Sequence, residues 1–65
     1  MIVNRKFLLA NMRSIRHLFA LRGYDVTPFT DTAIATAMLA ICPKRAPGWP
    51  SDEQLRAVFD RLAAA

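Results

Sequence analysis

The sequence predicts a small all-α domain of three helices, at about residues 5–22, 31–42 and 52–63, in a single domain that spans residues 1–65. Apolar residues recur at helical spacing in the first and third segments. The middle segment carries no charge between residues 32 and 42, and Pro28 and Pro43 bound it. These observations together indicate a helical fold built around an apolar middle helix.

The first segment has the pattern of an amphipathic helix. Asn4 is a favourable N-cap, and Gly23 is the residue type that commonly follows a helix end. On a helical projection, one side is apolar and consists of Phe7, Leu8, Met12, Ile15, Leu18 and Phe19. The other side is basic and consists of Arg5, Lys6, Arg13, Arg16 and His17. Leu9 and Leu21 lie outside the main apolar arc.

The connector that follows contains Tyr24 and Val26 in alternation with polar residues, which is compatible with a short extended segment. We expect Phe29 to anchor this connector in the core. Thr30 or Asp31 is expected to cap the second helix.

The middle helix has one bulky and one nearly flat arc. The bulky arc, which we expect to face the core, contains Ile34, Met38, Leu39, Ile41 and Cys42. The flat arc contains Thr32, Ala33, Thr36, Ala37 and Ala40. Very small domains often complete their core by oligomerising, so we expect a homodimer interface. The residues assigned to it are Ala33, Thr36, Ala37 and Ala40. The alternative is that this arc packs only against helices of the same chain.

The third helix has the clearest start signal. Ser51 and Gln54 have the spacing of a capping box. The buried stripe that follows is predicted to contain Leu55, Val58, Phe59 and Leu62. Arg56 and Asp60 have the spacing of an ion pair on one helix face. The preceding turn contains Trp49, which either caps the core or serves as a binding anchor beside Lys44 and Arg45.

Charge is concentrated in the first helix. Five basic residues and no acidic residue occur in positions 1–22, and the chain as a whole has a net charge of +4. The positive field is therefore expected to belong to this helix, where it favours an acidic partner.

The composition argues against catalysis and against a membrane span. One histidine, one cysteine and scattered acidic residues give no pattern for an active site, a metal site or a cofactor site. The apolar run at residues 32–42 is far shorter than the roughly 20 residues that a membrane helix needs. A single cysteine excludes an internal disulfide bond, which fits a reducing compartment, and we expect a cytoplasmic protein.

These patterns favour a non-enzymatic regulator or inhibitor that binds another protein with an acidic surface. The residues assigned to partner binding are Lys6, Arg13, Arg16, His17 and Trp49. Inhibitors and adaptors encoded by mobile elements often have this size and lack catalytic residues, so a bacterial mobile element or phage is an expected source. The alternative is a small DNA-binding regulator that contacts phosphates through the first helix. Association of that helix with anionic lipid is a third hypothesis.

Overall fold

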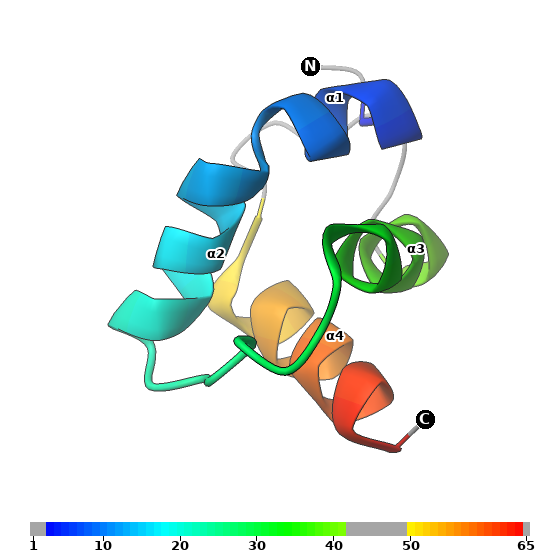
Figure 1. Cartoon of the computed structure of the whole chain (residues 1–65). Helices are drawn as coiled ribbons and strands as arrows, with labels where there is room; N and C mark the ends of the chain where they lie inside the picture. Colours follow the sequence, from blue (N-terminus) through cyan, green and yellow to red (C-terminus); the bar gives the residue numbers. More distant parts are fainter. Residues whose placement is uncertain (1–2, 42–49, 65) are drawn as a thin grey trace.

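The computed structural model describes residues 3–41 and 50–64. This part of the chain consists of helices joined by turns and loops, and it contains no strand. Its four helices are α1 (Arg5–Ala10), α2 (Met12–Leu21), α3 (Asp31–Ile41) and α4 (Asp52–Ala64). α3 packs against α4 and against α1, and α2 descends from α1 on the left of the view, across from α3 (Figure 1). The radius of gyration is 10.5 Å, close to the roughly 10.7 Å of a compact 65-residue domain. The predicted all-α fold class is thus confirmed.

The prediction of one helix at about residues 5–22 is wrong in one respect, because the helix is interrupted at Asn11. This residue has φ −111° and ψ 16°, and α1 and α2 run in different directions on either side of it (Figure 1). Its amide donates to the carbonyl oxygens of Phe7 (3.1 Å) and Leu8 (3.2 Å), and its side-chain Nδ2 donates to Phe7 at 2.8 Å. Asparagine competes for backbone groups in this way. The bend lays α1 against α3, where Leu8 is fully buried.

Both ends of the predicted first segment are confirmed. The Asn4 side chain accepts a hydrogen bond from the Phe7 amide at 2.8 Å, as an N-cap does. Gly23 has φ 81°, and its amide donates to the Ala20 carbonyl while the Tyr24 amide donates to Phe19. These two bonds form a Schellman motif, which ends α2 and turns the chain toward α4.

The connector between α2 and α3 is held by the Arg16 guanidinium. Nη1 donates to the Val26 carbonyl at 3.1 Å and Nη2 donates to the Phe29 carbonyl at 2.8 Å. Nε and Nη2 also donate to Oδ1 of Asp31, at 2.9 and 2.7 Å. One side chain of α2 therefore satisfies two loop carbonyls and fixes the first residue of α3. A planar guanidinium can make this set of bonds, whereas an ammonium on a flexible stem cannot match the geometry.

α3 starts at a cap provided by Thr30, whose Oγ1 accepts from the Ala33 amide at 3.1 Å. Its buried residues are Ile34, Ala35, Ala37 and Met38. Leu39 and Ile41, expected in the core, are only half-buried, and Cys42 lies outside the described residues. The buried side is therefore rotated toward the alanines relative to the prediction, because α1 and α4 cover α3 from two directions.

α4 begins with the predicted capping box. The Gln54 amide donates to Ser51 Oγ at 3.1 Å, and the Ser51 amide donates to Gln54 Oε1 at 2.9 Å. Leu55, Val58 and Leu62 are buried, and Phe59 is half-buried. Within the described residues, the predicted ion pair between Arg56 and Asp60 does not form. Asp52 instead pairs with Arg22 at the end of α2.

Aromatic side chains join the connector to α2 and α4. Tyr24 stacks on Phe59 with ring centroids 5.0 Å apart, and it meets Phe19 edge-on at 6.5 Å. Phe29 also meets Phe59 edge-on, with ring centroids 6.5 Å apart. The expectation that Phe29 anchors the connector is therefore confirmed. In the described residues, Tyr24 and Val26 belong to an irregular segment and not to a strand.

Asp25 stabilises the same connector from its outer side. Its Oδ1 accepts from the Thr27 amide at 3.0 Å and from the Thr27 hydroxyl at 2.6 Å, which closes an Asx turn. The hydroxyl bond, followed by the amide bond, holds the pKa of the Asp25 carboxyl below its ordinary value of 3.8. The ionised form of Asp25 thus favours the folded connector.

Arg16→Ala is expected to lower the stability of the domain by about 2 kcal/mol, because two loop carbonyls and Asp31 lose a charged donor. In a domain of this size, such a loss lowers Tm by roughly 15 °C. Arg16→Lys is expected to recover little of it. Arg13→Ala, at an exposed position, is the matched control and should shift Tm by no more than about 3 °C. Equal melting temperatures for the two alanine variants would contradict the role of Arg16.

Thr27→Val is expected to raise the pKa of Asp25 toward 3.8, since it removes the hydroxyl bond and keeps the amide bond. A lowered folded-state pKa stabilises the fold above pH 3.8, and that contribution is lost as pH falls through the folded-state pKa. The stability difference between the two proteins should therefore shrink on acidification across this range. Carboxyl NMR titration measures the pKa, and an unchanged value in Thr27→Val would refute the assignment.

Candidate binding surface

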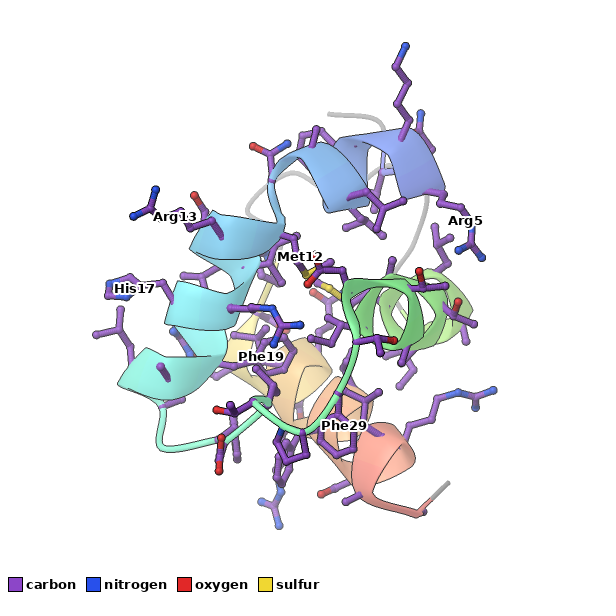
Figure 2. All side chains as sticks on the ribbon, in the orientation of Figure 1. Arg5, Met12, Arg13, His17, Phe19 and Phe29 are labelled. Atoms are coloured by element: carbon purple, nitrogen blue, oxygen red, sulfur yellow. The ribbon has the colours of Figure 1, made fainter. Side chains whose placement is uncertain are left out.

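Three of the five basic residues in the first segment are engaged within the chain. Arg16 holds the connector, and Arg22 forms an ion pair with Asp52 at the start of α4. Arg5 lies on the side of α1 nearest α3 (Figure 2), and its Nη2 donates to Thr36 Oγ1 at 3.3 Å. Most of the positive charge predicted for an open surface thus joins α1 and α2 to the rest of the fold.

The outward side of α2 carries Arg13, His17 and Leu21, which are each separated by four residues. This spacing places them in one row on the helix. Arg13 and His17 point away from α3 and α4 (Figure 2), and all three residues are exposed. Leu21 is 65% exposed, the larger value of the two exposed leucines in the described chain. In the same part of the chain, neither Arg13 nor His17 forms an ion pair.

Ser14 and Leu18 complete this surface. Ser14 is exposed and Leu18 is half-buried, and with Arg13 and His17 they border a shallow hollow on α2. We call the set Arg13, Ser14, His17, Leu18 and Leu21 the α2 face. It combines a positive charge, a histidine and two leucines on one helix, without an acidic residue among them.

The remaining residues assigned to partner binding do not join the α2 face. Lys6 is exposed, but it belongs to α1, whose axis turns away from that of α2 (Figure 1). Arg16 directs its donors to Val26, Phe29 and Asp31, so it does not belong to the α2 face. Trp49, with both of its predicted roles, lies outside the described residues.

The residues assigned to a dimer interface do not form one open face. Ala37 is only 5% exposed within the single chain, and Ala33 is half-buried. Thr36 and Ala40 are exposed, and Thr36 accepts the hydrogen bond from Arg5. Ala37 is therefore covered within the single chain, and the dimer interface itself stays a prediction. The single chain also covers Ile34, Ala35 and Met38 of this helix completely.

A second hollow, of 480 Å³, lies where α2 meets the connector, and its lining includes Arg16, Gly23, Tyr24 and Asp25. Both charged side chains there already have partners within the chain. Arg16 bonds to the loop carbonyls, and Asp25 bonds to Thr27 in its own turn.

In the described residues, no three His, Cys, Asp or Glu side chains gather as a metal site would require. Across residues 3–41 and 50–64, every helix is too short or too polar to reach across a bilayer.

Leu21 is not among the residues that the sequence assigns to partner binding. Leu21 falls outside the apolar arc of the first segment. The same projection places it in line with Arg13 and His17. A leucine on the basic side of an amphipathic helix is therefore the pattern that marks this surface.

Comparison of the chain with models of protein families, with curated proteins and with solved structures finds no match. The assignment of function therefore depends on the chemistry of the α2 face and on the rest of the fold.

Proposed function

We propose that this chain is a small non-enzymatic regulator or inhibitor that binds another protein through the α2 face. The observation that carries the proposal is the row formed by Arg13, His17 and Leu21. These side chains are exposed and span about 12 Å along the helix axis. A helix presented in this way is suited to a groove that accepts residues at positions i, i+4 and i+8.

The chemistry of the row defines the complementary surface. Burial of Leu21 in a pocket contributes as much as about 1.5–3 kcal/mol, which is the main gain available at this site. Arg13 provides a planar donor for a carboxylate, and it is free to do so because its guanidinium has no ion-pair partner in the described part of the chain. The partner that fits is thus an apolar groove with an acidic rim at the Arg13 end.

The fold weakens the alternative of a DNA-binding regulator. Binding to the phosphate backbone requires several cations in line, and each one contributes to a steep dependence on salt. Here Arg5, Arg16 and Arg22 are engaged within the chain, and the bend at Asn11 separates Lys6 from Arg13. The exposed leucine next to the remaining charges is also a poor contact for phosphate. The net charge of +4 is the observation that keeps this alternative worth testing.

The proposal predicts that Arg13→Glu and Leu21→Asp each weaken partner binding about tenfold or more, one by charge reversal and the other by loss of an apolar anchor. The partner is first captured on the immobilised wild-type chain from its source organism, and each variant is then titrated against the purified partner by calorimetry. Both positions are exposed, so the variants should melt within about 3 °C of the wild type.

Arg56→Glu is the matched control, because Arg56 is also an exposed helical arginine, on α4, and it makes no ion pair with the described residues. It changes the net charge by the same amount as Arg13→Glu. Equal loss of binding in the two arginine variants would show that net charge and not the α2 face is recognised. Tight binding to random duplex DNA that falls steeply between two salt concentrations would favour the DNA-binding alternative instead.

A further inference from the structure

The bend at Asn11 is not required by the local sequence. Neither Gly nor Pro occurs between Asn4 and Arg22, and the residues on both sides of Asn11 are helical. The buried residues Leu8, Met12 and Ile15, followed by Phe19, have the i, i+4, i+7, i+11 spacing of a single apolar stripe. A straight helix from Arg5 to Leu21 would therefore keep one continuous apolar side.

The bend interrupts the regular hydrogen bonding of the helix. The Leu8 carbonyl accepts from the Asn11 amide, three residues on, where a continuous helix would use the Met12 amide. The Asn11 side chain is turned back to Phe7, so α2 begins without a side-chain cap. Straightening the chain at Asn11 would add helical bonds and remove an uncapped helix start.

Contacts between α1 and α3 hold the bend in place. Leu8 of α1 is fully buried, and Arg5 of α1 bonds to Thr36 of α3. A chain that straightens gives up these contacts and leaves the covering position on α3 empty. The segment that fits this position is α1 itself, so α1 of a second copy restores the same contacts without any new surface.

From these observations we infer that the bend at Asn11 is a hinge for reciprocal exchange of α1 between two copies of this chain. In the exchanged dimer, residues 5–21 of each copy form one straight helix, and its α1 part packs on α3 of the other copy. The core contacts are the same as in the single chain, and the two forms differ in the conformation of the hinge. The occupant of the α3 surface is thus a second copy of the chain, and its contacts differ from the alanine interface considered from the sequence.

Asn11→Ala and Asn11→Gly are a matched pair for this hinge. Both remove the bond from Nδ2 to Phe7, but alanine favours a continuous helix over glycine by about fivefold per hinge. Two hinges per dimer predict a Kd about 30-fold lower for Asn11→Ala than for Asn11→Gly. Sedimentation equilibrium over a range of concentrations measures both values. Equal constants, or two variants that stay strictly monomeric, would overturn the inference.

Crosslinking distinguishes exchange from simple side-by-side association. Arg5→Cys and Thr36→Cys are introduced together with Cys42→Ser, and a short bismaleimide joins the two new thiols, whose parent side chains are in contact. The exchanged dimer of Asn11→Ala should give products linked between chains, whereas Asn11→Gly should give links within one chain. Links within one chain only, in a sample that sediments as a dimer, would contradict the exchange.

Ala10→Gly provides a comparison that leaves Asn11 intact, in case the Asn11 variants unfold. Ala10 is exposed and ends α1, so glycine costs less there than in the interior of a straight helix. Ala10→Gly should therefore weaken dimerisation relative to the wild type. An unchanged or tighter dimer in a chain with a normal helical circular dichroism spectrum would count against the hinge.

Discussion

Coverage of α3 is the constraint on which the rest of this structure depends. α3 has no charge after Asp31, and Ile34, Ala35 and Met38 are fully buried. Burial on this scale requires neighbours on more than one side, and the chain supplies them with α4 and with α1. α1 reaches α3 because the chain bends at Asn11, which a single straight helix would not allow. The bend thus allows a chain of only 65 residues to cover α3 with its own helices.

The need to hold α1 and α2 against the rest of the fold also explains where three of the arginines bind. Arg5, Arg16 and Arg22 each join the first two helices to another part of the fold, namely α3, the connector and the start of α4. An ion pair at the surface contributes little by itself. Arg16 differs, because its donors also bond to the loop carbonyls of Val26 and Phe29, of which Val26 has a second donor in the Phe29 amide. What remains open on α2 is therefore a smaller and more apolar surface than the net charge of the chain suggests.

The sequence predicts the features that depend on neighbouring residues. The N-cap at Asn4, the glycine end at Gly23 and the capping box at Ser51 are local, and all three are present. The bend at Asn11 is not predictable in this way, because it depends on contacts between α1 and α3 that are distant in sequence. A strong amphipathic period conceals it, since the apolar residues on both sides share one phase.

The same distinction applies to the candidate site. Arg13, Arg16 and His17 are indistinguishable on a helical projection, because all three lie on the basic side. Only the connector shows that Arg16 is structural, and the connector's path is a tertiary property. The sequence shows that Leu21 lies outside the apolar arc. That it belongs to a surface with Arg13 and His17 follows only from the exposure of all three residues in the structure. The surface is thus anticipated in its location and not in its composition.

Native-state hydrogen exchange of the dilute wild-type chain tests the central claim most directly. If α3 is covered by its own chain, its amides should be among the slowest to exchange, with the same free energy of opening as those of α4. Such agreement would show that α3 opens only when the whole domain unfolds. Exchange of the α3 amides well ahead of those of α4 would contradict the account, because it would mean that this helix lacks cover in the single chain.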